Sequence, residues 1–150
     1  MLRKISHSEQ ETRDLGRTLP ATLQGGDIVL LKGELGTGKT TLTKGIAEGL
    51  GIQEEITSPT FTLMNVYKIK NYLSNLKGEI KNLVHIDTYR LKNEDELLAI
   101  GAEDYLGALD TICIIEWPEK IENLLRAKKV KKIFLKHDKN DKRILSLDIL

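Results

Sequence analysis

The chain of 150 residues contains a single cysteine, Cys113. One cysteine cannot form an internal disulfide or a zinc site made of several thiolates. Long hydrophobic runs are missing as well: stretches such as IVLL and ICII hold four residues, whereas a membrane span needs roughly 20. The first residues, MLRKISHSEQ, lack the apolar centre of a signal peptide. We therefore expect a cytoplasmic protein with no membrane segment.

Neither sign of charge dominates, since 23 basic and 22 acidic side chains give a net charge of +1. The charges are unevenly spread, however. Residues 86–122 carry three basic and ten acidic side chains, and residues 126–143 carry nine basic and two acidic ones. Two solvated faces of a neutral protein are the favoured interpretation; the alternative is that the basic segment meets RNA, a nucleotide or an acidic partner.

The chain has no repeat, low-complexity tract or Pro/Ser-rich linker, and its length predicts one domain over residues 1–150. Hydrophobic periodicity predicts helices over residues 8–23, 38–51, 94–106 (with a break at Gly101) and 118–128. It predicts strands over residues 27–33, 60–69, 82–87, 111–117, 130–137 and 143–150, with a hairpin tip at 70–79. The alternation favours an α/β fold, a three-layer sandwich with a mostly parallel sheet and an antiparallel C-terminal pair.

A phosphate-binding loop is the clearest motif. The segment GELGTGKT, from Gly33 to Thr40, matches G-x-x-x-x-G-K-[ST] in full, with a strand before it and a helix after it. Glycines allow the backbone to approach a phosphate, and the N–H groups at the helix start form an anion nest. Lys39 would neutralise β- and γ-phosphate oxygens, and the Thr40 hydroxyl can bind Mg²⁺. This motif predicts a P-loop NTPase fold.

Such a loop needs a carboxylate opposite it, and two acids end apolar strands. Asp87 ends NLVHID and Glu116 ends TICIIE. In a parallel sheet the carboxyl ends of strands line the ligand crevice, so we expect at least one of the two to be catalytic. His85 and Asp87 share a strand face and could form a metal pair, but no further ligand is near in sequence. A packed, hydrogen-bonded His85 is the favoured interpretation.

Three further features leave alternatives open. The hydroxyl-rich ITSPTFT segment is either ordinary turn chemistry or a switch loop in which Thr60 senses the γ-phosphate. Trp117 either packs in the core or contacts the site. The sequence has neither the N-K-x-D motif of guanine-specific GTPases nor the arginine-rich lid of small kinases. A small-molecule or nucleoside kinase remains the alternative enzyme class, and a nucleotide-binding module without turnover is the other.

The ordered set GELGTGKTTLTKGIAEGLG, SPTFTLMNVY, HIDTYRL, AIGAEDYL and IIEWPE closely resembles the bacterial TsaE ATPases, from about Glu11 to about Glu119. That resemblance implies an accessory ATPase in the synthesis of threonylcarbamoyladenosine next to the tRNA anticodon. It implies that the protein binds the TsaB–TsaD complex, meets tRNA through that complex, and uses ATP and Mg²⁺ to reset it between turnovers.

The resemblance also implies roles for single residues. Lys39, Asp87 and Glu116 would be catalytic, Thr40 and Glu116 would hold Mg²⁺, and Trp117 would lie beside the site. The nucleotide would be bound by Thr12, near the base, and by Glu34, Leu35, Gly36, Thr37, Gly38, Lys39, Thr40 and Thr41. Two departures stand out: Thr88 replaces a usual leucine, which should be harmless, and the segment from Lys68 to Val84 looks longer than the common hairpin.

Overall fold

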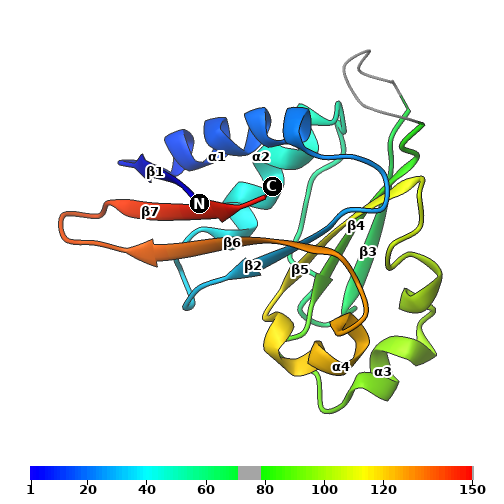
Figure 1. The fold of residues 1–150 in the computed structure, drawn as a ribbon. Helices are drawn as coiled ribbons and strands as arrows, with labels where there is room; N and C mark the ends of the chain where they lie inside the picture. The colour runs from blue at the N-terminus through cyan, green and yellow to red at the C-terminus, as the bar shows by residue number, and fades with distance from the viewer. Residues whose placement is uncertain (71–78, 150) are drawn as a thin grey trace.

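The computed structural model describes residues 1–70 and 79–149, and in this part of the chain seven strands form one sheet of order β1-β7-β6-β2-β5-β4-β3 (Figure 1). Neighbouring strands run parallel in β4, β5, β2 and β6, and antiparallel in the β3–β4, β6–β7 and β1–β7 pairs. The strands are β1 (Leu2–Ser6), β2 (Ile28–Lys32), β3 (Met64–Lys68), β4 (Asn82–Asp87), β5 (Thr111–Glu116), β6 (Val130–His137) and β7 (Arg143–Asp148).

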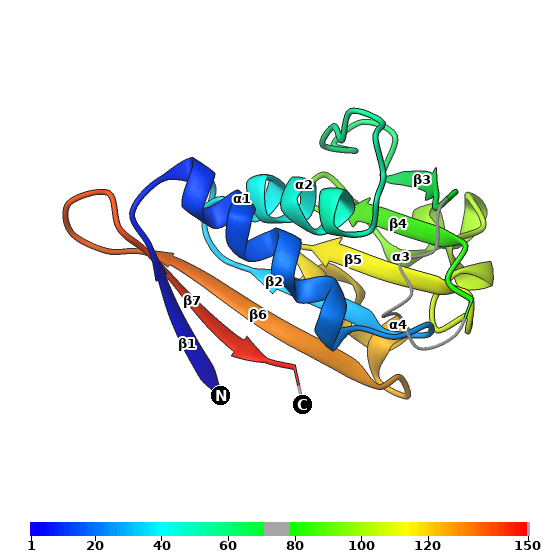
Figure 2. The same ribbon diagram turned by 90° about the horizontal axis from the view of Figure 1, so that it is seen from above.

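Helices cover both faces of the sheet (Figures 1 and 2). On one face lie α1 (Glu9–Thr18) and α2 (Lys39–Gly49), side by side, and on the other lie α3 (Glu94–Ala99) and α4 (Glu122–Leu125). Short 3-10 turns, η1 (Leu19–Thr22), η2 (Ala102–Asp104) and η3 (Pro118–Ile121), extend or precede these helices. The expected layered α/β arrangement is therefore present.

Strand β2 shows why both faces need cover, because it is apolar on each side. Val29 and Leu31 pack with Leu42 of α2 in one core, whereas Ile28 and Leu30 join a second core on the opposite face. Alternate residues of a strand point to opposite faces, so a continuous apolar run is buried only between two layers. The phosphate-loop candidate follows directly from this central strand.

Local signals explain the ends of α1. The Ser8 hydroxyl accepts a hydrogen bond from the Glu11 backbone N–H at 3.0 Å, and the Glu11 carboxylate accepts one from the His7 N–H at 2.7 Å. The first bond is the one that a capping box between Ser8 and Glu11 requires, a pattern readable from the sequence, whereas the second reaches the residue before the N-cap Ser8. The α-helix ends at Thr18, and Pro20 lies in the 3-10 turn that follows.

Several predictions about the sheet and about the bounds of its elements were wrong. The sheet is mixed rather than mostly parallel, since half of its pairings in the described residues are antiparallel. The N-terminal strand β1 was missed. The helix expected over 118–128 is only a 3-10 turn and one α-helical turn. Strand β3 begins at Met64 because residues 60–63 form a turn. Residues 71–78, which make up most of the expected hairpin tip at 70–79 and part of the segment from Lys68 to Val84, lie outside the described residues.

Candidate functional site

The loop between β2 and α2 turns sharply at glycines. Gly36 and Gly38 have φ angles of 77° and 101°, a left-handed region that side chains with a Cβ rarely adopt. Gly38 is the N-cap of α2, and no side chain caps the helix start. The first N–H groups of the helix are therefore left for a ligand, as an anion-binding loop requires.

Lys39 is buried, and its ammonium lies inside the loop. Its Nζ donates to the carbonyl oxygens of Gly33 at 2.6 Å and Glu34 at 3.0 Å. The same Nζ lies 4.4 Å from the ring centre of Trp117. Burial lowers the pKa of Lys39, against the opposing effect of nearby carboxylates, of which Glu116 is the strongest. The ammonium is thus held next to the helix start without a carboxylate bound directly to it among the described residues.

The two predicted acids meet at one edge of the sheet. Asp87 ends β4, Glu116 ends β5, and the two residues are directly paired in the parallel register. Glu116 is also paired with Leu31, at the end of β2 from which the loop departs. Both carboxylates are almost completely buried. The expectation that strand ends bring these acids to the loop is confirmed in geometry.

One oxygen of Glu116 has two polar neighbours. Its Oε1 accepts a hydrogen bond from the Thr40 hydroxyl at 3.3 Å, and it lies 2.8 Å from Nε2 of His85. His85 is fully buried, and its Nδ1 has no hydrogen-bond partner in the described part of the chain. The packed, hydrogen-bonded interpretation of His85 is therefore confirmed. Among residues 1–70 and 79–149, no group of three or more His, Cys, Asp or Glu side chains is arranged so that it could hold a metal ion.

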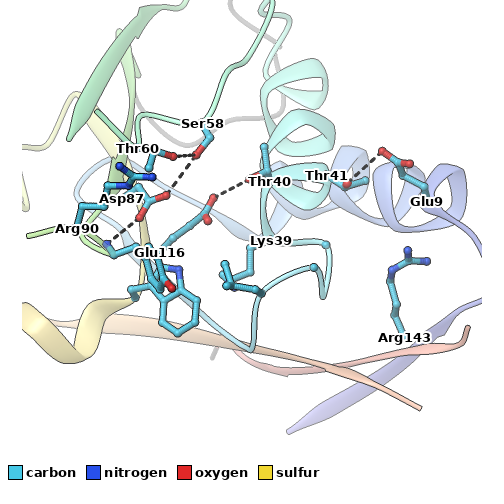
Figure 3. A pocket seen from close by; sticks show the side chains of 15 residues that line it. Glu9, Lys39, Thr40, Thr41, Ser58, Thr60, Asp87, Arg90, Glu116 and Arg143 are labelled. Carbon is cyan, nitrogen blue, oxygen red and sulfur yellow. Dashed lines mark hydrogen bonds between the residues drawn. The ribbon is translucent and has the colours of Figure 1, made fainter. Parts of the chain in front are cut away.

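Asp87 connects the hydroxyl-rich loop to the site. Its Oδ2 accepts a hydrogen bond from the Ser58 hydroxyl at 3.3 Å, and its Oδ1 accepts one from the Tyr89 backbone N–H at 2.9 Å. The Ser58 and Thr60 hydroxyls are 2.9 Å apart. The SPTFT segment therefore lies beside the acids, where a ligand at the loop would contact it (Figure 3).

A cavity of about 480 Å³ joins these groups. Both acids, Ser58 and Thr60 line it (Figure 3). Trp117 lines it too. The phosphate-loop candidates that line it are Leu35, Gly36, Gly38, Lys39, Thr40 and Thr41. Its polar lining and its position at a helix start suit a phosphorylated ligand.

Two predicted ligand residues, Thr37 and Thr12, lie behind the loop instead of in the cavity lining, and the exposed Glu34 does not line the cavity either. Thr37 is buried and donates through its hydroxyl to the Glu34 carbonyl at 2.8 Å, which shapes the loop from within. Thr12 on α1 is fully buried, and its hydroxyl lies 2.7 Å from that of Ser6. The Thr12 methyl would be 3.6 Å from a Cβ placed on Gly38, so this residue supports the glycine turn.

Trp117 lies at a left-handed turn, with φ 57°, just after β5. Its ring packs against Tyr89 with a centroid distance of 4.9 Å and an interplanar angle of 47°. The Thr88 hydroxyl donates toward the backbone carbonyl oxygens of Glu116, at 3.2 Å, and of Trp117. Trp117 therefore faces the cavity and packs against Tyr89, and it belongs to neither hydrophobic core, so the structure favours contact with the site over packing in the core.

Sequence reasoning missed four cavity residues or loop contacts. Tyr89 and Glu9 line the cavity, and the Glu9 carboxylate accepts a hydrogen bond from the Thr41 hydroxyl at 3.4 Å. Arg143 at the start of β7 lines it too, and Nε2 of His137 lies 2.7 Å from the Gly36 carbonyl oxygen. No local motif marks the last two, because the β6–β7 hairpin reaches the loop only in the folded sheet.

Comparison with known proteins decides the family. A family model described as threonylcarbamoyl adenosine biosynthesis protein TsaE matches residues 6–145. The chain belongs to the TsaE family. This match confirms the resemblance stated from the motifs. The family is named for the biosynthesis of threonylcarbamoyl adenosine.

Individual TsaE proteins match over most of their length. The tRNA threonylcarbamoyladenosine biosynthesis protein TsaE of Treponema pallidum is 41% identical over 124 residues, covering 83% of this chain and 84% of that protein. The one from Rickettsia typhi is 35% identical over 142 residues, covering 94% and 90%. The crystal structure of Bacillus subtilis YdiB matches with a TM-score of 0.71 and 30% identity, covering 99% of this chain and 86% of that one.

The helices of this TsaE-family chain are short. Across the described ranges, none is both long and apolar enough to cross a bilayer.

Proposed function

We propose that this chain is an accessory ATPase that binds and hydrolyses Mg-ATP, and so resets the TsaB–TsaD complex between rounds of threonylcarbamoyl transfer to tRNA. The observation that carries the proposal is the convergence of Lys39, Thr40, Asp87 and Glu116 on one cavity at the start of α2. A phosphate chain on the loop N–H groups would place its terminal phosphate between the lysine and the two acids. The membership in the TsaE family supports the pathway.

The donors present fit Mg²⁺. Mg²⁺ prefers oxygen ligands and usually takes one or two from the protein, with the rest from water and substrate phosphates. The Thr40 hydroxyl and the Glu116 carboxylate, 3.3 Å apart, form such a pair of oxygens. These two residues would hold the ion, which would supply charge neutralisation on the β- and γ-phosphate oxygens. His85 keeps the Glu116 carboxylate oriented from the protein side.

Each of the remaining side chains would have a separate role in ATP hydrolysis. Lys39 would exchange its two carbonyl partners for phosphate oxygens and stabilise negative charge on them. Asp87 would orient the water that attacks the γ-phosphorus, releasing ADP and inorganic phosphate. Ser58, hydrogen-bonded to Asp87, couples the SPTFT loop to that reaction. The loop would be held while the γ-phosphate is present and released afterwards, which makes hydrolysis a conformational switch.

The test is multiple-turnover threonylcarbamoylation of tRNA with purified TsaB–TsaD and the threonylcarbamoyl donor. We expect the wild-type chain to sustain turnover beyond the first round and Lys39→Ala to fail. Lys44→Ala is the matched control, because it removes a lysine one turn further along α2, outside the cavity lining. Equal action of wild type and Lys39→Ala, or no effect of either, would contradict the proposal.

The variant Glu116→Gln distinguishes an ATPase from a module that only binds the nucleotide. The substitution keeps the shape of the side chain and removes its charge. We expect this variant to bind ATP while hydrolysing it at least a hundredfold more slowly, and to fail in multiple turnover. If Glu116→Gln supports wild-type turnover while Lys39→Ala does not, binding alone is sufficient. Phosphoryl transfer to a nucleoside faster than hydrolysis would instead favour a kinase.

A further inference from the structure

The half of the sheet formed by β6, β7 and β1 has helices on one face only. On the covered face, alternate residues of β6 and β7 pack in the core beneath α1 and α2: Ile133, Leu135, Leu145 and Leu147. On the other face α3 and α4 lie below β2, β5 and β4, and no helix of the described ranges lies below β7 and β1 (Figures 1 and 2). The intervening residues therefore form an open surface, which we call the outer sheet face: Arg3, Ile5, Lys132, Phe134, Lys136, Ile144, Ser146 and Asp148.

An aromatic ring lies in the middle of the outer sheet face. Phe134 belongs to neither hydrophobic core, and 37% of its surface is exposed. A hollow of about 650 Å³ borders the ring, and Ile144 lines the same hollow. Ile144 is paired directly with Ile5 on β1, which is also exposed. Adjoining apolar side chains with a polar border are typical of an interaction surface.

Cations without a carboxylate partner surround the ring. Lys132 and Lys136 are two residues before and after Phe134 on β6, so each lies on the same face, about 7 Å along the strand. Arg3 lies beyond β7 in the same cross-strand row as Phe134 and also borders the hollow. None of the three cations forms an ion pair within the described part of the chain.

The charge of this region is predominantly positive. Residues 2–6 and 130–148 together carry eight basic and three acidic side chains. Asp148 is the acid on the outer sheet face, paired with Lys132 in the register, and Asp138 borders the hollow. The cations outnumber these acids, so the surface attracts an anionic partner.

We propose that the outer sheet face binds single-stranded RNA directly, with a base stacked on Phe134 and neighbouring phosphates on Arg3, Lys132 and Lys136. A ring flanked by cations suits an unpaired strand, because every base has a flat face and every nucleotide carries a phosphate. An acidic peptide would supply the charge without a base to stack on the ring, so the exposed Phe134 favours RNA.

This inference goes beyond the proposed function, in which the chain meets tRNA only through the TsaB–TsaD complex; only the choice of RNA over DNA rests on that function. No residue of the outer sheet face lines the cavity at the phosphate-loop candidate. RNA binding should therefore need neither ATP nor the partner proteins, and Lys39→Ala should bind RNA as the wild type does.

The experiment measures Kd for a short radiolabelled single-stranded RNA by filter binding at low salt, without nucleotide or partner proteins. Phe134→Leu keeps an apolar side chain and removes the ring. We expect it to raise Kd about fivefold or more, because the stacking of a base on an aromatic side chain is lost. Phe134→Tyr keeps a flat ring and should bind within twofold of wild type. This rescue separates stacking from a general need for apolar surface.

Lys136→Gln tests the phosphate contacts. We expect weaker binding at low salt and a dependence of log K on log salt concentration that is shallower by about 0.7, the contribution of one phosphate contact on a single strand. Lys92→Gln is the matched control, because it removes an exposed lysine between β4 and α3, away from the outer sheet face. It should change neither the affinity nor the salt dependence.

Three results would overturn the inference. The first is no measurable RNA binding by the wild type at low salt, and the second is a Kd that Phe134→Leu leaves within twofold. The third is polyglutamate binding as tightly as RNA, weakened by Lys136→Gln and not by Phe134→Leu, which would assign the surface to an acidic protein segment.

Folding and the proposed function are checked separately. If Phe134→Leu does not fold, judged by its thermal transition, Lys136→Gln decides, because its side chain is exposed. Unchanged RNA affinity and salt dependence in that variant would then contradict the inference. A wild-type chain that binds RNA in this way but does not sustain turnover contradicts only the proposed function. One that sustains turnover without binding RNA contradicts only this inference.

Discussion

At the scale of residues, burial decides what several side chains can do. The Glu116 carboxylate is held on one oxygen by the Thr40 hydroxyl and by His85, within a nearly closed environment. Such preorganisation means that little rearrangement is needed when a ligand arrives. Cys113, in the middle of β5, is equally buried, and its thiol donates a hydrogen bond to the Tyr105 carbonyl at 3.4 Å.

Cys113 gives a prediction about pH. Burial raises the pKa of this thiol to about 12 from an ordinary value of 9.0. Between these two values the unfolded chain loses the thiol proton and the folded chain keeps it, so the folded state binds more protons. The free energy of unfolding should therefore fall as pH rises through this window, by about 1.4 kcal/mol per pH unit from this residue.

The measurement compares wild type with Cys113→Ala in urea unfolding at pH 8 and pH 10.5. The other alkaline groups titrate in both proteins, so the difference between the two pH dependences isolates the thiol. We expect the wild type to lose about 2 kcal/mol more than the variant over this interval. Parallel pH dependences would show that the thiol does not titrate in this way.

At the scale of elements, α1 and α2 pack against each other at close range. A Cβ on Gly45 would lie 2.1 Å from the Arg13 carbonyl oxygen, and one on Gly16 would lie 2.6 Å from the Leu42 carbonyl oxygen. Distances this short cannot be relieved by rotating a side chain, because the atoms met belong to the backbone. The two helices therefore approach each other through glycine, and α2 positions the loop at its own start.

Gly45→Ala should destabilise the protein even though alanine favours helices. Helix propensity alone would stabilise the variant by up to about 1 kcal/mol, but the backbone overlap should cost about 1–3 kcal/mol or more. Chemical denaturation measures the net loss. Lys44→Ala, one residue earlier and only half-buried, is the control and should change stability by less than about 0.5 kcal/mol. A stabilised Gly45→Ala would contradict the close helix approach.

The elements that the sequence predicts correctly are those with their own local signal. The apolar runs of β2, β4 and β5, the Ser8 cap and the glycine break at Gly101 are all readable from neighbouring residues. Strand β1 was missed because most of its residues are exposed, so it shows no apolar pattern and is held by pairing with β7. The helix after Pro118 was overestimated because Ile121, with φ −129°, interrupts it.

The same distinction applies to the site. The loop and the two acids are marked by glycine spacing and by strand ends, so sequence places them together. Arg143 and His137 reach the loop through the register of a hairpin about a hundred residues away, which no local pattern encodes. Thr12 shows the reverse case: the family resemblance assigns it to the base, and the structure places its hydroxyl on Ser6, behind the glycine turn.

At the scale of the whole molecule, the parallel centre of the sheet carries the chemistry and the antiparallel outer strands supply its borders. Strands β2, β4 and β5 end at the cavity, and β7 brings Arg143 to the opposite end. Because a ligand there would contact several separate elements, its binding should stabilise the fold as a unit.

That coupling can be measured directly. ADP at a hundred times its Kd should raise the free energy of unfolding of the wild-type chain by about 2.7 kcal/mol. Lys39→Ala should show no such gain at the same concentration, whereas Lys44→Ala should behave as wild type. An equal gain in Lys39→Ala would mean that the nucleotide binds away from the loop.

The position of Trp117 makes its fluorescence a probe of the cavity. It is the only tryptophan in the chain, and its indole lies 4.4 Å from the Lys39 ammonium. Under the proposed function, the charge beside the ring would shift when Lys39 leaves the carbonyl groups of the loop for a phosphate. The tryptophan fluorescence of the protein, separated from that of its four tyrosines by the excitation wavelength, therefore comes from the cavity, and its intensity should follow occupancy of the loop without any attached dye.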